Sequence, residues 1–588
     1  MKEELYINGE AVDLDESVNI TLNYKSNMLT DLSKIVGNNS YTIKLPKTQK
    51  NLGIIGCADM PGAVSSFPRV THDARYFRNG VEIVSRGKAV LLAVNEAIEV
   101  VLTWGSTNAL LRVVEDSKKL NKFGGISDYV DWNENTSASV YNAFSNVMFP
   151  SLYLGLNAIN PGAALHPAVR SSYVFDLIKR EYGLTLEFPD ESKAFVESLI
   201  IPLLTRNGGY ANRVNNMGTH IKNDLTDRGT IIKGGSDFDK VFKVETGLEN
   251  LTTIQVLVDC TVVIVPTFET IFLGSAVQYG TESVLDNTIY MPYEVRNDMG
   301  LTVYTYSEPV KIDLKANDYF RVVGVYATSN GLNNAYYTFG AQPNEVQLGD
   351  RFPLVENLPD IKIVDFIKAV ASMSGLFAIP SADGKVLKFV SFDSLGDRTR
   401  AVDWSDKVVY SNISERPKQI GYALDGFAQN NRMKYKEDDT VAMLADGNIL
   451  IGDKTLDYER DAVVLPFAPS DGMMGRAQIK LYEYNDGLPE LQDVEPRILI
   501  EKNEGGLSVG TFDGLHWSAL INNYYSTYQN TIKTPVVITE NVLLDEFTLR
   551  DMDLSIPIYL RQYGRYYAVV EVKAPSNGVC ECKLLQLD

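Results

Sequence analysis

In the stretch Phe77-Arg78-Asn79-Gly80-Val81-Glu82-Ile83-Val84, apolar and polar residues alternate on both sides of an Asn-Gly dipeptide, which is the pattern of a β-hairpin. Asn-Gly suits the two-residue turns of hairpins because both turn positions need positive φ. The same device places Asn8-Gly9 between Leu5-Tyr6-Ile7 and Ala11-Val12, and Asp383-Gly384 between residues 376–379 and 386–389. Hairpins recur along the chain, so the sequence predicts a mainly β (α+β) fold.

Strand patterns also mark both ends of the chain and its middle. Residues 1–110 are predicted to form one β-rich domain, which ends in a strand at 97–102 where apolar and polar residues alternate. Residues 566–585 are predicted to form a closing hairpin that turns at Ser576-Asn577-Gly578. We expect that hairpin to complete a barrel or sandwich. Short strands at close spacing predict an inserted β-sandwich in the middle, with runs at 252–258, 261–265, 303–306 and 320–325.

Two helices interrupt the β pattern. Ser171-Ser172 is expected to cap the first, which ends at Gly183 and feeds the extended residues 184–189. The second begins near Pro359-Asp360 and ends at Gly375, before the extended residues 376–380. Their predicted apolar stripes are Val174, Leu177, Ile178 and Tyr182 in the first, and Ile363, Phe366, Ile367 and Val370 in the second.

The two helix-strand units resemble each other, since Asp176-Leu177-Ile178-Lys179 aligns with Asp365-Phe366-Ile367-Lys368. Internal duplication is one interpretation of the match. The alternative is that any amphipathic helix that ends in glycine and feeds a strand has this appearance.

The length of 588 residues predicts several domains, because one hydrophobic core rarely grows so large. We expect a β-barrel/β-sandwich framework with two short helix-strand units. The predicted segments are an N-terminal β domain (1–110), a mixed α/β segment with a helix near 172–182 (111–239), the inserted β-sandwich (240–345), a second helix-strand unit with β-sheet (346–480) and a C-terminal β domain (481–588).

Composition excludes several classes of protein. Hydrophobic residues make up 45% and charged residues 22%, which are ordinary values for a globular protein. The net charge of −20 repels nucleic-acid backbones, so no sequence-specific nucleic-acid binding is expected. The four cysteines are too dispersed for a disulfide framework or a zinc site, and no apolar run is long enough to span a membrane. Neither a secretory leader nor a membrane anchor is expected.

Motifs for catalysis are weak. Gly506-Leu507-Ser508-Val509-Gly510, with His516 nearby, matches a nucleophile elbow in letters. However, glycine-rich loops flank it where an elbow needs a strand and a helix, so a hairpin is the preferred interpretation. Asp438-Asp439 and the pair Asp237 and Asp239 have the character of solvated loop charges.

No zinc-hydrolase, calcium-loop or phosphate-loop pattern is present, and the histidines His72, His166, His220 and His516 are widely separated. Scattered calcium sites, or paired carboxylates for glycoside hydrolysis, stay open on the sequence alone. We therefore expect no enzyme, with no catalytic, cofactor-binding or metal-binding residue and no cofactor.

Cysteines and tyrosines point to packing or interfaces. Cys580 and Cys582 lie two apart on one strand, so they share a face, and core or edge packing is expected for them. Tyrosines suit both strand packing and interfaces. Both interpretations apply equally to the tyrosine clusters at 336–337, 482–484, 524–528 and 563–567.

Five segments together resemble tail proteins of phages and prophages that infect Bacteroides-type bacteria. They are Leu5–Gly9 with Val12-Asp13-Leu14, Ser40–Thr48 with Asn51, Asn357–Lys368, Phe389 to Asp403-Trp404-Ser405, and Tyr559–Tyr567. Residues from about 205 to 345 lie outside the resemblance.

The resemblance implies a baseplate hub or tail-tip protein in the virion tail, made in the host bacterial cytoplasm. It also implies a β framework with two similar halves, a trimer or other ring that joins the tail tube to a spike or fibres, and contacts with other tail and baseplate proteins. It carries no catalytic residues. An acidic ring would let DNA pass without sticking, since like charges repel.

The alternative class is an extracellular carbohydrate-binding or glycan-processing β-sandwich protein, because tyrosines also form sugar platforms. If the chain is a tail protein, the inserted sandwich is expected to decorate the outside, to bind neighbouring baseplate proteins or to contact a host surface glycan.

Overall fold

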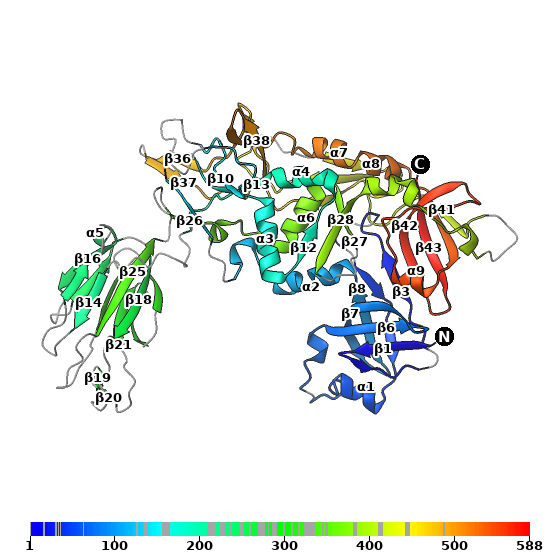
Figure 1. The fold of residues 1–588 in the computed structure, drawn as a ribbon, viewed down its shortest axis with the longest axis horizontal. Coiled ribbons are helices and arrows are strands. Elements are labelled where there is room, and N and C mark those ends of the chain that lie inside the picture. Colours follow the sequence, from blue (N-terminus) through cyan, green and yellow to red (C-terminus); the bar gives the residue numbers. More distant parts are fainter. Residues whose placement is uncertain are drawn as a thin grey trace. The chain divides into compact units, whose positions relative to one another are not determined.

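The computed structural model describes most of the chain. The described residues are 2–15, 18–29, 32, 35, 37–62, 64–124, 128–133, 139–155, 165–207, 218–222, 230–233, 238–246, 252–257, 260–268, 277–279, 282–284, 291–297, 300–306, 310–314, 318–322, 335–343, 346, 348, 351–379, 385–409, 416–441, 447–485 and 488–587. Figure 1 shows the fold, which is mainly β, as predicted.

The chain divides into two compact units, and each is made of separate stretches of sequence. Unit 1 comprises residues 1–124, 137–204 and 358–588, and unit 2 comprises residues 125–136 and 205–357. None of the described helices is both long and apolar enough to cross a membrane.

One large sheet in unit 1 joins the two ends of the chain. β3 (Leu22–Lys25) pairs with β42 (Arg565–Ala574), which forms the closing hairpin with β43 (Val579–Leu587). The full order is β2 (Glu10–Ala11), β1 (Glu3–Ile7), β6 (His72–Arg78), β7 (Val81–Val94), β8 (Ile98–Trp104), β4 (Asn38–Ser40), β3, β42, β43, β40 (Val537–Leu543) and β30 (Gln419–Gly421).

Three further strands attach to this sheet: β5 (Ile43–Leu45) on β8, β41 (Ile558–Leu560) on β42, and β29 (Val402–Asp403) on β41. Among the described strands the path runs from β2 to β30 without closing on itself, so the barrel part of the prediction is not confirmed. The five-segment division stays a prediction. The sheet nevertheless shows that strands of the predicted first and last segments share hydrogen bonds.

The turns that the sequence predicted have the expected backbone. Asn8 and Gly9 have φ of 51° and 83°, and Asn79 and Gly80 have φ of 50° and 81°. Asparagine and glycine tolerate this left-handed region better than other residues, which explains their use here. Asp383-Gly384 lies outside the described residues, although the strands on either side of it, β27 (Leu376–Ile379) and β28 (Val386–Ser391), do pair antiparallel.

The first predicted helix is α3 (Ser171–Tyr182), and it ends at Gly183 with φ 66°, as predicted. The predicted cap is wrong. Arg170 is the N-cap residue, and the Ser171 hydroxyl is buried and donates to the main-chain oxygen of Val196. The hydroxyl that the local sequence pattern assigned to helix capping therefore forms a tertiary hydrogen bond instead.

The second predicted helix is α6 (Ile363–Met373), which begins three residues after Asp360. Its predicted stripe is buried, and Gly375 ends it with φ 63°. This glycine is also required by a close approach, because a Cβ there would lie 2.6 Å from the main-chain oxygen of Tyr524.

The two helix-strand units contribute to one small sheet, with order β12 (Thr185–Glu187), β28 and β27. β12 runs parallel to β28 and β27 antiparallel to it, so the strands that follow the two helices run in opposite directions. Phe175 of α3 and Phe366 of α6 are in ring contact at 5.8 Å. This arrangement is compatible with duplication, which stays a hypothesis.

Two more sheets complete the framework of unit 1. One has the order β10 (Val147–Met148), β11 (Ala168–Arg170), β13 (Leu199–Pro202), β38 (Leu499–Glu504) and β39 (Leu507–Thr511). The other has the order β32 (Gly447–Leu450), β31 (Asn430–Lys434) and β33 (Glu459–Val464). The remaining described α-helices of unit 1 are α1 (Gln49–Ile54), α2 (Ser106–Asp116), α4 (Asp190–Ser198), α7 (Trp517–Tyr524), α8 (Ser526–Lys533) and α9 (Glu546–Arg550). Two hairpins lie beside them, β34 (Asp471–Met473) with β35 (Arg476–Gln478) and β36 (Tyr482–Asn485) with β37 (Leu488–Leu491).

Unit 2 contains two five-stranded sheets, as expected for a sandwich. Phe242 of one sheet and Phe339 of the other are buried and in ring contact at 5.4 Å, so the sheets pack face to face. The first sheet has the order β15 (Thr230–Lys233), β14 (Gly218–Lys222), β25 (Ala335–Pro343), β18 (Cys260–Phe268), β23 (Val310–Leu314), and the second has the order β16 (Phe242–Thr246), β17 (Thr252–Val256), β24 (Tyr319–Val322), β21 (Met291–Asn297), β22 (Gly300–Tyr306).

The predicted strand at 320–325 is described only to residue 322, and its last three residues lie outside the described part. Unit 2 also contains α5 (Phe238–Val241) and two short strand pairs, β9 (Tyr129–Asp131) with β26 (Arg351–Pro353) and β19 (Val277–Tyr279) with β20 (Glu282–Val284).

Candidate functional site

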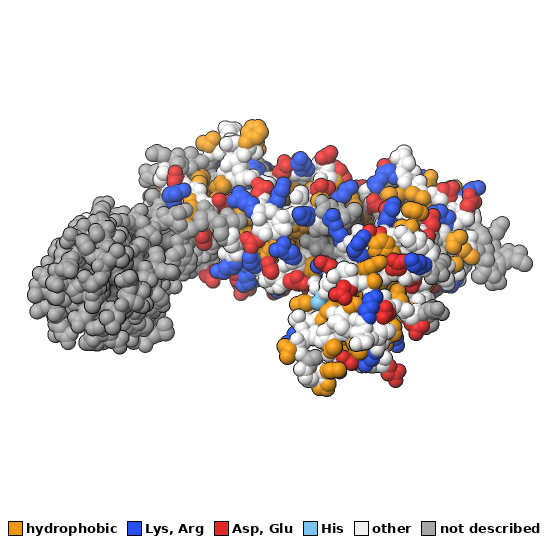
Figure 2. All heavy atoms as spheres, turned by 60° about the horizontal axis from the view of Figure 1, so that its bottom comes forward, with side chains coloured by type: hydrophobic (Ala, Val, Ile, Leu, Met, Phe, Trp, Pro, Cys, Tyr) orange, Lys and Arg blue, Asp and Glu red, His pale blue; other side chains and the backbone are white. Residues whose placement is uncertain are grey.

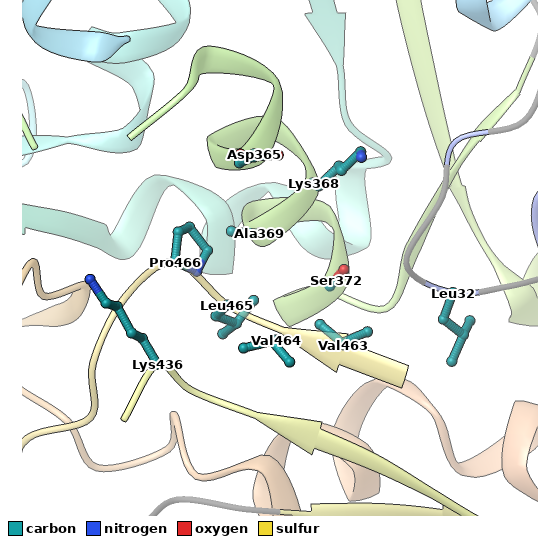
Figure 3. Close-up of a pocket in the computed structure, with 10 residues that line it drawn as sticks. All are labelled: Leu32, Asp365, Lys368, Ala369, Ser372, Lys436, Val463, Val464, Leu465 and Pro466. Atoms are coloured by element: carbon teal, nitrogen blue, oxygen red, sulfur yellow. The ribbon is translucent and has the colours of Figure 1, made fainter. Parts of the chain in front are cut away.

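A groove of about 410 Å³ lies in unit 1 between helix α6 and strand β33 (Figure 3). α6 lines it with Asp365, Lys368, Ala369 and Ser372, which follow one another at spacings of three and four residues and so share a helix face. Residues 463–466 form the opposite wall. The volume lies within the roughly 300–1,000 Å³ that is typical of binding pockets.

Helix α6 contributes one face to the core and another to the groove. The stripe that contains Ile363, Phe366, Ile367 and Val370 is buried in the core. The stripe from Asp365 to Ser372 lines the groove with two small residues and two charged ones; Asp365, Lys368 and Ser372 are half-buried, and Ala369 is buried. A helix with only one apolar face to bury leaves such a second stripe available for contact with something else.

Two lysines and one aspartate give the groove its charge. Lys436 is at one end, where its ammonium lies 2.5 Å from a carboxylate oxygen of Glu495. Lys368 is half-buried, and within the described part of the chain its ammonium is within ion-pair distance of no carboxylate. This local charge differs from the net −20 of the chain. On the face that Figure 2 shows, basic and acidic side chains are intermingled.

The sequence that matches a nucleophile elbow, residues 506–510, lies in a hairpin, as expected. Ser508 is on β39, and the turn before it contains Gly505 and Gly506, with φ of 62° and 91°. The Ser508 hydroxyl is buried and donates to Glu501 at 2.6 Å. His516 instead stacks edge-on against a phenylalanine ring 5.2 Å away. The described contacts therefore give Ser508 a structural hydrogen bond.

Two of the histidines are buried with both ring nitrogens in hydrogen bonds. His72 lies between Asn8, 3.0 Å from Nδ1, and the main-chain oxygen of Phe67, 2.9 Å from Nε2. His166 lies between a main-chain oxygen and the hydroxyl of Tyr482. In each ring one nitrogen donates to a main-chain carbonyl and the other has a side-chain partner, so both rings have a structural role inside the fold.

No metal site is formed by the described side chains, since nowhere do three or more His, Cys, Asp or Glu groups come together. The side chain of His220 lies outside the described part of the chain.

Asp438 corrects the prediction of solvated loop charges. Its side chain is 5% exposed and forms an ion pair with Arg497, which is 1% exposed. Burial favours a higher pKa for Asp438, but hydrogen bonds from Thr440 and the charge of Arg497 outweigh it and hold the pKa below its ordinary value. Asp439 is exposed, as predicted.

The second predicted loop pair is only partly described. Asp239 is exposed and lies 2.5 Å from the Lys233 ammonium, which fits a solvated charge. Asp237 lies outside the described residues.

Cys580 and Cys582 pack in the core of the large sheet, as expected. Both thiols are free and buried. Burial raises the pKa of Cys580 to about 11 and also raises the pKa of Cys582. Thiols with raised pKa values are poor nucleophiles and poor metal ligands at neutral pH.

The described tyrosines of the predicted clusters mostly serve packing. Tyr482, Tyr525, Tyr528 and Tyr567 are buried. Tyr528, for example, contacts the rings of two phenylalanines. The side chains at 336–337 and 484 lie outside the described part, so the interface interpretation is not decided for them.

The residues that carry the tail-protein resemblance meet in two places in the fold. At the first, Asn51 is 1% exposed, donates to the main-chain oxygens of Asp13 and Pro46 at 2.9 Å, and accepts from the Asp13 amide. Thr48 donates to the Asp13 carboxylate at 2.7 Å and caps α1. The first and second resembling segments are thus locked together.

At the second place, segments about 150 residues apart are joined. β29 runs parallel to β41, and the Trp404 amide donates to the Tyr559 oxygen at 3.1 Å. The Arg561 amide donates to the Ser405 hydroxyl at 2.8 Å, and its guanidinium lies 3.9 Å from Asp403. These motif residues hold the framework together.

Sequence reasoning missed the groove and the buried ion pairs. The helix spacing from Asp365 to Ser372 was visible in the sequence, but the strand that faces it is about a hundred residues away. The pairs Arg170–Glu501 and Asp438–Arg497 likewise join distant segments. Only the fold brings these residues together.

No protein-family model matches the sequence, and no curated protein matches it either. Among solved structures, the chain is similar to the prophage MuSo2 43 kDa tail protein from Shewanella oneidensis, at 7% identity and a TM-score of 0.30. That alignment covers 100% of this chain and 96% of the other.

Proposed function

We propose that the chain is a non-enzymatic structural component of a phage or prophage tail, and more specifically a baseplate hub or tail-tip protein that forms a ring. The observation that carries the proposal is the structural role of residues in the segments that resemble tail proteins. Asn51, Asp13, Ser405 and Arg561 make hydrogen bonds that join separate segments of the framework. Of the resembling segment 357–368, Asp365 and Lys368 line the groove. A motif that builds a framework is what a structural family would retain.

The division of the chain supports the same proposal. The resembling segments, apart from Asn357, fall in unit 1, whereas residues 205–345, which lie outside the resemblance, fall in unit 2. A framework unit with a separate β-sandwich is the arrangement expected of a ring protein that carries an accessory module. In this proposal unit 2 contacts neighbouring tail proteins or a host glycan.

Self-association is supported by one edge of the large sheet. Among the strands that the structure describes, β30 pairs with β40 alone, and its Ile420 is 48% exposed. Tyr422, just beyond β30, is 68% exposed, and Leu543 on β40 is 54% exposed. An open edge with apolar side chains tends to pair with another chain, and a closed oligomer protects it.

The test is the mass of the full chain by light scattering over a concentration series, followed by imaging of any ring. We expect a trimer or another closed ring. Ile420→Lys should shift the mass toward the monomer, whereas Val114→Lys should not, since Val114 is equally exposed at 48% but lies on α2. A monomer at every concentration would contradict the ring. A glycan array then tests the alternative, a carbohydrate-binding protein.

A further inference from the structure

Phe144 lies in a turn of unit 1, and its side chain is 98% exposed. Burial of a phenylalanine removes roughly 150–250 Å² of mostly apolar surface from water, so its full exposure is unfavourable. Four residues earlier, Val140 lies opposite Leu507 in a β-bridge, and these side chains are 64% and 46% exposed. Exposed aromatic and aliphatic side chains that gather on one part of a surface indicate an interaction site.

The turn is held in place by hydrogen bonds from a buried side chain. The Phe144 amide donates to the Asn142 side-chain oxygen at 3.0 Å, and the Ser145 amide donates to the Asn142 main-chain oxygen at 3.2 Å. Arg170, which is 7% exposed, donates to the main-chain oxygens of Asn142 at 3.3 Å and Ser145 at 2.9 Å. The charge of Arg170 is in turn paired with the buried Glu501. Because a fixed backbone loses little entropy on binding, this turn is prearranged for contact.

The sequence around Phe144 is free of charge. Residues 135–169 contain no Lys, Arg, Asp or Glu, and they are the longest stretch of the chain without one. The chain as a whole has a net charge of −20, so copies of it repel one another. Two acidic copies can meet at an uncharged, apolar surface without placing like charges together, and such a surface requires no basic partner. The charge pattern therefore favours a second copy of this chain as the partner.

We infer that Phe144 is an anchor residue in the contact between copies of this chain, and that its ring inserts into an apolar site on the neighbouring copy. A ring of three or more copies is built from heterologous contacts, in which one surface meets a different surface of the next copy. The site that receives the ring therefore lies outside the turn at residues 142–145. This inference rests on the proposed function, since it names a contact that closes the ring.

The experiment replaces Phe144 in the full chain with the photoreactive amino acid p-benzoylphenylalanine and irradiates the protein over a concentration series. We expect a covalent dimer whose yield rises with concentration, and mass spectrometry should place the crosslink outside residues 142–145 of the second copy. A crosslink within one chain would overturn the inference, because it would mean that another part of the same chain covers the ring.

The matched control places the same photoreactive group at Phe547. This side chain is also exposed, at 58%, but the Arg550 guanidinium lies over its ring, 5.3 Å from the centroid. We expect crosslinking between copies from position 144 and not from position 547. Equal yields from the two positions would overturn the inference, because they would report random collision.

Substitutions measure the contribution of the ring by light scattering. Phe144→Ser should raise the concentration of half-association by at least about thirtyfold, the effect of losing an interface hot spot. Phe547→Ser should leave it unchanged, and Phe144→Leu, which stays apolar, should raise it less than Phe144→Ser does. Because an exposed side chain contributes little to folding, Phe144→Ser should keep the circular dichroism spectrum of the unchanged chain.

Failure of this inference differs from failure of the proposed function. If the unchanged chain forms a ring and Phe144→Ser forms it equally well, the anchor is contradicted and the ring is retained. If the unchanged chain is a monomer at every concentration, both the anchor and the ring are contradicted.

Discussion

Arg78 is predicted to hold the two ends of the chain together. Its side chain is 1% exposed, and its guanidinium donates to the main-chain oxygens of Ile20 at 3.0 Å and Pro575 at 3.1 Å. It also lies 3.6 Å from the carboxylate of Glu3, which is 9% exposed. One side chain thus joins β6, the segment before β3 and the closing hairpin.

Replacing Arg78 by methionine keeps much of the volume but removes the positive charge that faces the buried Glu3 carboxylate and one donor from each of the two carbonyls. Glu3 keeps its hydrogen bonds from Tyr76 and Ser576. Removal of one partner of a buried ion pair typically lowers the free energy of unfolding by about 3–5 kcal/mol. Arg75→Met is the matched control on the same strand. Its pair with Glu82 is exposed, at 54% and 27%, and such pairs contribute about 0–1 kcal/mol.

The assay is hydrogen exchange of the full chain, read on peptides that cover β3 and β42. At about 1.4 kcal/mol per factor of ten, Arg78→Met should accelerate exchange in these strands by roughly a hundredfold or more, and Arg75→Met by less than about tenfold. Equal acceleration in both variants would refute the reasoning, because it would mean that the buried guanidinium contributes no more than an exposed one.

Three other substitutions give separate tests. Gly375→Ala should lower the melting temperature more than Gly183→Ala, because both glycines have positive φ but only at Gly375 does a Cβ meet a main-chain oxygen at 2.6 Å. Ser508→Ala should leave any activity of the protein unchanged and lower the free energy of unfolding by about 1–3 kcal/mol, since the buried Glu501 carboxylate loses the hydroxyl donor of Ser508 and keeps its ion pair with Arg170. Asp438→Asn should destabilise the chain at neutral pH. Because the pKa of Asp438 is lowered in the folded state, its stabilisation is present above the unfolded pKa of about 4 and is lost as the pH falls through the folded value, so urea unfolding should show the gap between the two proteins closing in acid.

Local features of the fold could be predicted because local residues determine them. Asn79-Gly80 forces a hairpin turn through its backbone preference alone, and Gly375 ends α6 for the same reason. The buried stripe of α6 follows from helical periodicity. Each of these features depends on residues within a few positions of one another.

Long-range features could not be predicted in this way. The pairing of β3 with β42 joins residues more than five hundred positions apart, and no local pattern specifies it. Asp438 was expected to be solvated because its neighbours are polar, but its partner, Arg497, is 59 residues away. Ser171 was expected to cap a helix, but its hydroxyl donates to the main-chain oxygen of Val196, 25 residues away.

The candidate site belongs to the same class. The spacing of Lys368 and its neighbours on α6 could be read from the sequence, but the wall formed by residues 463–466 comes from a segment about a hundred residues away. The sequence therefore supplied the residues of one wall and no indication of the other.

The central claim, a structural role in a tail, is tested most directly by locating the chain in particles. An antibody against the chain, applied to intact tails purified from the source that encodes it, should label one end of the tail in electron micrographs, and the chain should sediment with the particles. If the chain stays in the free soluble fraction and the tails are unlabelled, the account is contradicted.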